Sequence, residues 1–232
     1  MYDDFSARVG TRTPGVQAAL RDLSPGAAVL DSACGIGIDT LALHRRGLRV
    51  TATDASRAMV EQCRARLGEA DVDLPVSICT WEDLPARFGA VFDAVLCTGN
   101  SLAHTLSDEA RRAAVAGLAG VLAPLGSLVL DSQDWSVLHR QGSHTDDDPL
   151  VVERDGHRVT RGFDWLVPER FGDLIQLTLT LRIVGVDTAR HEVIFRPFTT
   201  DTLVDELRAA GLAEVTVTQV PGDDRFAVVA RR

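Results

Sequence analysis

The stretch 29–56 constrains the fold more than any other part of the chain. It reads VLDSACGIGIDTLALHRRGLRVTATDAS. An apolar run leads into a turn at Gly35 and Gly37, a segment with helical apolar spacing stops at Gly47, and a second apolar run ends on Asp54. This order of strand, glycine turn, helix, strand and acid predicts a right-handed βαβ unit, which binds its ligand at the carboxyl ends of its strands.

The spacing within this stretch separates two kinds of ligand. A dinucleotide-binding turn needs a third small residue so that helix and strand pack around a pyrophosphate, but Thr40 stands at that position. What remains is a close backbone approach at Gly35 and Gly37, an acid at Asp31 that ends the first strand, and Asp54 to accept hydrogen bonds from ribose hydroxyls. These features indicate a nucleoside without phosphates.

The residues of this turn also carry a family resemblance. Segment 31–37, DSACGIG, resembles the D-x-A-C-G-x-G form of motif I in class I S-adenosylmethionine-dependent methyltransferases, and segment 53–56, TDAS, resembles their ribose-binding turn. The resemblance implies S-adenosylmethionine as the cofactor, held by Asp31, Ala33, Gly35, Gly37, Asp54 and Ala55. The alternative is an ordinary α/β domain with a glycine turn and no cofactor.

A second motif follows the predicted fourth strand, 91–96. Segment 99–104, GNSLAH, is similar to the stretch that borders the reacting centre in glycine and sarcosine N-methyltransferases. The resemblance places Cys97 and Gly99 beside the cofactor, and Asn100 and His104 beside the reacting atoms. We expect the Asn100 side-chain oxygen or a nearby carbonyl to present an amine. His104 is either the base for a hydroxyl acceptor or a structural hydrogen-bonding residue.

The acidic turn 80–85, TWEDLP, follows the predicted third strand, 75–79. In the resembled family this turn covers the adenine. We therefore expect Trp81 to form the flat wall of the adenine site, with Thr80 and Glu82 near the edge of the ring. The competing interpretation makes Trp81 an ordinary core residue.

The amino-terminal segment 1–25 is expected to cover the cofactor. It contains a predicted helix over 14–23, and the resemblance implies an arginine before the first strand that meets the methionine carboxylate of the cofactor. Arg12 or Arg8 fits that role. Both could equally be solvated surface arginines.

The segment 131–135, DSQDW, departs from the resembled branch. Glycine N-methyltransferases carry an arginine followed by asparagine where this chain has Gln133 and Asp134, and that arginine clamps the carboxylate of the amino acid. A neutral amide cannot replace a two-pronged guanidinium contact. We therefore expect a small, uncharged or cationic amine as the acceptor, in contact with Gln133, Asp134 and Trp135.

The whole chain of 232 residues is expected to form one α/β domain. Its core is a doubly wound, mainly parallel, seven-stranded sheet of the Rossmann-like methyltransferase type, completed by a terminal hairpin over 214–220 and 226–230. A small antiparallel sheet, inserted over about 136–198, is the candidate substrate lid; the strict period of two over 174–184 marks one of its strands. The last helix, 200–210, should have Thr200 or Asp201 as its N-cap.

Composition narrows the partners. Asp and Glu number 33 against 24 Lys and Arg, which gives a net charge of −9 and disfavours nucleic acid as a substrate. Four isolated cysteines indicate a reduced, cytoplasmic protein, and the chain has no apolar run long enough for a membrane span. The acidic run 146–148 beside His144 is expected to be a solvated loop, and no metal is expected. Monomer and homodimer both remain open.

Three functions compete at this point. N-methylation of a small amine by in-line methyl transfer is favoured. O-methylation of a hydroxylated natural product, with His104 as the base, is the second. The third is a domain that binds S-adenosylmethionine without catalysis.

Overall fold

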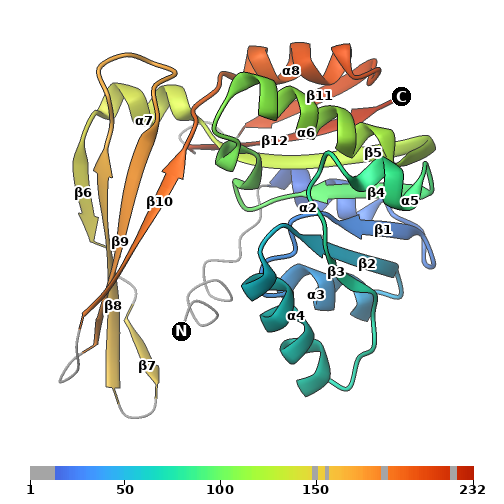
Figure 1. Ribbon diagram of the computed structural model, residues 1–232, viewed down its shortest axis with the longest axis horizontal. Helices are drawn as coiled ribbons and strands as arrows, with labels where there is room; N and C mark the ends of the chain where they lie inside the picture. The colour runs from blue at the N-terminus through green and yellow to red at the C-terminus, as the bar shows by residue number, and fades with distance from the viewer. Residues whose placement is uncertain (1–13, 148–150, 155–156, 184–187, 220–223) are drawn as a thin grey trace.

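The computed structural model describes residues 14–147, 151–154, 157–183, 188–219 and 224–232. These residues form a large sheet covered by helices and a smaller sheet that stands beside it (Figure 1). The two sheets are joined by β5 and α7 on the way out and by β10 on the return.

The large sheet has the strand order β11-β12-β5-β4-β1-β2-β3. Among β1 to β5, strands that are neighbours in the sheet pair in parallel. Strand β12 pairs antiparallel with both β5 and β11. This confirms the predicted seven-stranded, mainly parallel sheet with a terminal hairpin. The order reverses between β1 and β4, which is where an open α/β sheet leaves a crevice for a ligand. The strands are β1 (Ala28–Asp31), β2 (Arg49–Asp54), β3 (Val76–Ile78), β4 (Phe92–Cys97), β5 (Leu122–Gln133), β11 (Glu214–Gln219) and β12 (Arg225–Arg231).

Helices cover both faces of this sheet because each presents an apolar stripe. One face is covered by α2 (Pro14–Arg21), α3 (Ile38–Arg45) and α4 (Arg57–Glu69), whose Val16, Leu43 and Leu67 are buried against the strands. The other face is covered by α5 (Leu84–Phe88), α6 (Asp108–Gly120) and α8 (Thr200–Ala209), whose Leu84 and Leu118 belong to the largest core cluster.

Side-chain oxygens cap three of the helices, and the predicted N-cap of the last helix is wrong. Ser56 caps α4 and Ser107 caps α6, each through its side-chain oxygen. The N-cap of α8 is Thr199, not Thr200 or Asp201: Thr199 has extended backbone, and its Oγ1 accepts a hydrogen bond of 3.1 Å from the backbone N–H of Thr202. The preceding Phe198 is anchored in the core, which fixes where the chain turns into the helix.

The inserted sheet is confirmed and has five strands, in the order β10-β9-β8-β6 with β7 paired to β8. Every pairing is antiparallel, and Trp165 lies opposite both Leu177 and His144, so these side chains share one face. The acidic run does not begin as a loop, since Asp146 lies in β6 and pairs with Phe163. The strands are β6 (His144–Asp147), β7 (Val152–Arg154), β8 (His157–Leu166), β9 (Ile175–Ile183) and β10 (Ala189–Phe195).

The helix α2 lies on a sheet face rather than over the carboxyl ends of the strands. It packs against β12, β11 and β5, and Gly15 is so close that an added Cβ would lie 2.9 Å from the Cβ of Ala227. Residues 1–13, which include Arg8 and Arg12, fall outside the described residues, so the cofactor-covering role of segment 1–25 stays a prediction. Among the helices that are described, none has the length and apolarity to cross a membrane.

Candidate functional site

The glycine turn after β1 is held open by its own backbone geometry. Gly35 and Gly37 both adopt positive φ, at +52° and +82°, which other residues reach only with strain. An added Cβ at Gly37 would lie 2.7 Å from Sγ of Cys63 on α4, whereas one at Gly35 would meet no heavy atom within 4 Å. The turn therefore packs tightly on its α4 side and leaves space at Gly35.

Asp31 holds this turn in place through a buried hydrogen bond. Its side chain is 1% exposed, and its Oδ2 accepts a hydrogen bond of 2.6 Å from the hydroxyl of Thr40. Thr40, the residue that argued against a dinucleotide-binding turn, thus links the first turn of α3 to the end of β1. We infer that Asp31 positions the turn, while Gly35 and the partly exposed Ala33 face the ligand side.

Asp54 joins the glycine turn to the turn after β2. Its Oδ2 accepts from the backbone N–H of Gly35 at 2.9 Å and its Oδ1 accepts from that of Ser56 at 2.8 Å. A carboxylate offers about four acceptor positions, so about two remain. Two vicinal ribose hydroxyls need that number. The neighbouring Ala55 is exposed at the same turn.

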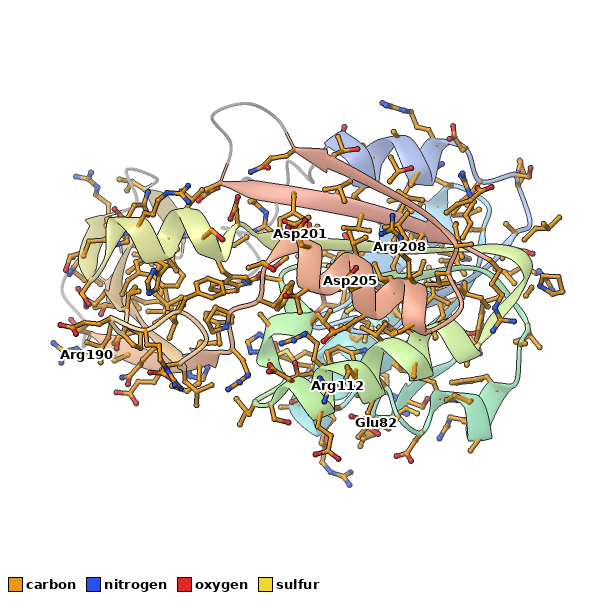
Figure 2. The ribbon with its side chains drawn as sticks, turned by 90° about the horizontal axis from the view of Figure 1, so that it is seen from above. Glu82, Arg112, Arg190, Asp201, Asp205 and Arg208 are labelled. Atoms are coloured by element: carbon orange, nitrogen blue, oxygen red, sulfur yellow. The ribbon has the colours of Figure 1, made fainter. Side chains whose placement is uncertain are left out.

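Trp81 is fixed at the edge of the crevice. Its indole N–H donates to the carbonyl of Ser32 at 3.0 Å, and its side chain is only partly buried, so it is both a core contact and an available wall. Helix α6 packs directly against the backbone of this turn at Gly117. A Cβ added at Gly117 would lie only 2.7 Å from the carbonyl carbon of Trp81. Thr80 donates to the Asp83 carboxylate at 2.9 Å, and Glu82 is exposed at the periphery of the molecule (Figure 2).

The turn after β4 is clamped by an acid that the sequence analysis did not single out. Gly99 and Asn100 both have positive φ, at +76° and +68°. Their backbone N–H groups donate to the same Oδ1 of Asp131, at 2.6 and 3.2 Å. Asp131 is buried near the carboxyl end of β5, next to β4. Only its place at a strand end could have indicated this role.

Asn100 does not have the free oxygen that we expected. Its Oδ1 accepts from the hydroxyl of Ser132 at 2.8 Å and from the backbone N–H of Gln133 at 3.1 Å, which uses both lone pairs of an amide oxygen. The expectation that this oxygen receives the acceptor amine is therefore corrected. Asn100 joins the turn after β4 to the end of β5.

His104 ends the short 3₁₀ helix η1 (Ser101–His104). Its ring packs on Phe195 of the inserted sheet, with 4.9 Å between the ring centroids. The ring keeps contact with solvent, but the atoms packed around it lower the pKa of His104 below its ordinary value, against smaller raising effects from the Ile194 backbone and Asp54. The imidazole therefore gives up its proton at a lower pH than an ordinary histidine does.

The three predicted acceptor residues separate in the structure. Gln133 is half-buried at the end of β5. Asp134 caps α7 (Trp135–Gln141), accepting from the N–H groups of Ser136 and Val137, and its Oδ2 accepts from the Gln219 amide at 3.0 Å. Asp134 is half-buried in this position.

Trp135 is a core residue, which corrects its assignment to the acceptor site. Its side chain is 0% exposed, its N–H donates to the Ser132 hydroxyl at 3.1 Å, and its ring centroid lies 5.1 Å from that of Phe195. Cys97 is likewise fully buried, and burial raises the pKa of its thiol. Only the backbone of Cys97 could contribute to a cofactor site.

The described residues fit S-adenosylmethionine. The site offers open space at Gly35, unused acceptor positions on Asp54 and an anchored indole at Trp81. Asp31, Asp54 and Asp131 lie at the carboxyl ends of strands, with Asp39 in the first turn of α3 and Asp134 at the start of α7. Arg225 lies 3.4 Å from the Asp131 carboxylate, and the remaining excess of acids favours a cationic ligand over an anionic one.

Comparison with known proteins agrees with this geometry. The family described as "Methyltransferase domain" matches residues 29–126. The glycine/sarcosine N-methyltransferase of Aphanothece halophytica is 32% identical over 114 residues, which is 49% of this chain and 43% of that protein. The chain thus spans less than half the length of this relative.

Two further relatives match over more of the chain. The cypemycin N-terminal methyltransferase of a Streptomyces species is 30% identical over 198 residues, covering 85% of this chain and 76% of that protein. The solved sugar N-methyltransferase from Streptoalloteichus is 26% identical with a TM-score of 0.75, covering 100% of this chain and 93% of its own. Together with the motif I turn, these matches show that the chain belongs to the S-adenosylmethionine-dependent methyltransferases of class I.

Proposed function

We propose that this protein transfers the methyl group of S-adenosylmethionine to the amine nitrogen of a small-molecule acceptor. The observation that carries the proposal is the match over most of the chain to two N-methyltransferases whose names give unlike acceptors, a peptide amino terminus and a sugar. An amine is the group that such acceptors share.

The protein's part in this reaction is binding and orientation. The cofactor supplies a methyl group already activated on a sulfonium, so the residues must align the nucleophile and exclude water. Asp54 would accept the ribose hydroxyls, the backbone at Gly35 would approach the nucleoside, and Trp81 would cover the adenine. Asp131 would hold the turn of Gly99 in place beside the reacting atoms.

The charges at the rim favour an uncharged or cationic acceptor. Asp134 is an acid where the glycine N-methyltransferases resembled by this chain place an asparagine, and Gln133 offers an amide in place of the clamping arginine. A free carboxylate at this position would be repelled. A neutral His104 can take the proton that an ammonium acceptor must lose before its nitrogen attacks.

O-methylation is the second candidate, and His104 is the observation that favours it. An imidazole whose pKa is lowered by the atoms packed around it is available in its neutral form to deprotonate a hydroxyl as well as an ammonium.

The first test is calorimetric titration with S-adenosylmethionine and, separately, with S-adenosylhomocysteine. We expect both to bind. Asp54→Ala should weaken each by about 100-fold, since two hydrogen bonds to a charged group are worth about 3 kcal/mol together. Asp201→Ala, an exposed acid on α8 (Figure 2), is the matched control and should bind as the wild type does. If Asp54→Ala binds both ligands with the wild-type affinity, the assignment of the ribose site is contradicted.

The second step is to identify the atom that is methylated. The protein is incubated with [methyl-¹³C]S-adenosylmethionine and a panel of amino sugars, short peptides and phenols, and the products are analysed by NMR. An N-methyl carbon is expected. Label only on oxygen would replace the amine proposal by the hydroxyl one, and binding of cofactor without transfer to any member of the panel would refute both for these acceptor classes.

A further inference from the structure

The exit strand of the inserted sheet delivers an aromatic residue to the turn after β4. Phe195 ends β10, is 6% exposed, and has the rings of His104, Trp135 and Trp165 around it at centroid distances of 4.9, 5.1 and 6.2 Å. The inserted sheet thus contacts His104 through the ring of Phe195 and through the backbone of Ile194, which hydrogen-bonds the imidazole. The position of the histidine ring depends on where β10 ends.

The next residue fixes that end of β10 to the main domain twice. The backbone N–H of Arg196 donates to the carbonyl of Ala103, the residue before His104, at 2.8 Å. Its side-chain Nε donates to Oδ1 of Asp108, in the first turn of α6, at 2.9 Å. The side chain of Arg196 is 26% exposed and that of Asp108 is 51% exposed, so this ion pair lies at the surface and is open to water on the Asp108 side.

The acid that receives Arg196 is itself held in place. Asp108 also accepts from Arg111 at 3.1 Å, and its carboxyl pKa is lowered, chiefly by the bond from Arg196. Arg111 is 2% exposed and makes two bonds of 2.9 Å to Glu206 of α8. A chain of alternating charges therefore runs from the exit of the inserted sheet to the interface between α6 and α8.

We propose that Arg196 is a positioning residue for His104. Its ion pair with Asp108 and its backbone bond to Ala103 set the end of β10, so that Phe195 holds the imidazole at the carboxyl end of β4. This inference rests on the proposed function only in assigning His104 to the acceptor; the placement of the ring can be measured without turnover.

The test compares Arg196→Gln with a matched control, Arg190→Gln. Arg190 is an exposed arginine of the same strand and lies at the outer end of the small sheet, away from α6 (Figure 2). Three measurements are made: the steady-state kinetics of the acceptor (kcat and KM), the affinity for S-adenosylmethionine, and the NMR resonance of the His104 ring. That resonance is assigned among the chain's six histidines by its absence in His104→Gln.

Arg196→Gln should lower kcat by about 10- to 100-fold, which is the scale of a small misplacement of a reacting group. It should also shift the His104 resonance toward that of an unstacked imidazole and leave cofactor affinity at the wild-type value. Arg196→Lys, which keeps the charge facing Asp108, should recover part of kcat. Arg190→Gln should leave all three measurements unchanged.

A double variant identifies the partner. If the effect passes through Asp108, Arg196→Gln combined with Asp108→Asn will be no slower than the slower single variant. Wild-type kcat and an unmoved His104 resonance in Arg196→Gln would overturn the inference, and so would a loss of cofactor affinity as large as the loss of kcat. A moved resonance while His104→Gln turns over normally would uphold the positioning and refute instead the proposed role of His104.

Discussion

The contact between α6 and the Trp81 turn predicts opposite effects for the same substitution at two helical glycines. Gly117→Ala would place a methyl group 2.7 Å from the Trp81 carbonyl carbon, a backbone atom that cannot rotate away. Gly68→Ala on α4 would add the same methyl group in open space. An overpacked site costs about 1–3 kcal/mol, whereas replacing a helical glycine by alanine in open space gains about 0.5–1 kcal/mol.

We therefore expect Gly117→Ala to lower the free energy of unfolding by about 1–3 kcal/mol and Gly68→Ala to raise it by about 0.5–1 kcal/mol. Urea unfolding at equal m values measures both. Because the displaced backbone carries Trp81, Gly117→Ala should also weaken binding of S-adenosylmethionine in calorimetry, and Gly68→Ala should not. A Gly117→Ala protein as stable as the wild type, with unchanged affinity, would refute the close approach of α6 to this turn.

Two further predictions concern buried and partly buried charge. Glu206→Gln removes the charged partner of Arg111, which is 2% exposed, and should lower the free energy of unfolding in urea by about 3 kcal/mol. Asp205→Asn, at the exposed neighbouring position, should lower it by less than about 0.5 kcal/mol. Equal effects of the two substitutions would contradict the buried ion pair. Burial lowers the pKa of His104 below 6.5, so the unfolded chain takes up this proton first as the pH falls, and the stability due to the neutral ring is lost between about 6.5 and the lower native pKa. The acid limb of kcat/KM should accordingly have its midpoint below 6.5 and vanish in His104→Gln; a midpoint above 6.5 would contradict the desolvated ring.

The cofactor half of the site was predictable because its contacts are local in sequence. Glycine at positions 35 and 37 indicates a turn with positive φ, and Asp54 follows these residues at the spacing of a βαβ unit. The structure adds the bond from Gly35 to Asp54, which spans only 19 residues and follows from placing two parallel strands side by side. Residue type and periodicity were sufficient there.

The acceptor half was predicted less well because it is assembled by long-range contacts. The bonds from Asn100 to Ser132 and Gln133 and the stacking of His104 on Phe195 join segments that periodicity leaves unrelated. Trp135 shows the limit clearly. From sequence alone, an aromatic residue after a strand end can line a ligand site or belong to the core. Trp135 belongs to the core because α7 packs on the inserted sheet, a contact that the sequence pattern does not reveal.

This division is consistent with relatives that share the methyltransferase domain while their names give unlike acceptors. The matched methyltransferase domain, 29–126, holds the glycine turn, Asp54, Trp81 and the turn after β4, but ends before the carboxyl end of β5 and the inserted sheet. The contacts that place His104 come from outside it, through Asp131 on one side and Phe195 on the other. A change in the inserted sheet can therefore alter the acceptor site while the glycine turn and Asp54 stay as they are. Arg196 lies where these two halves are joined.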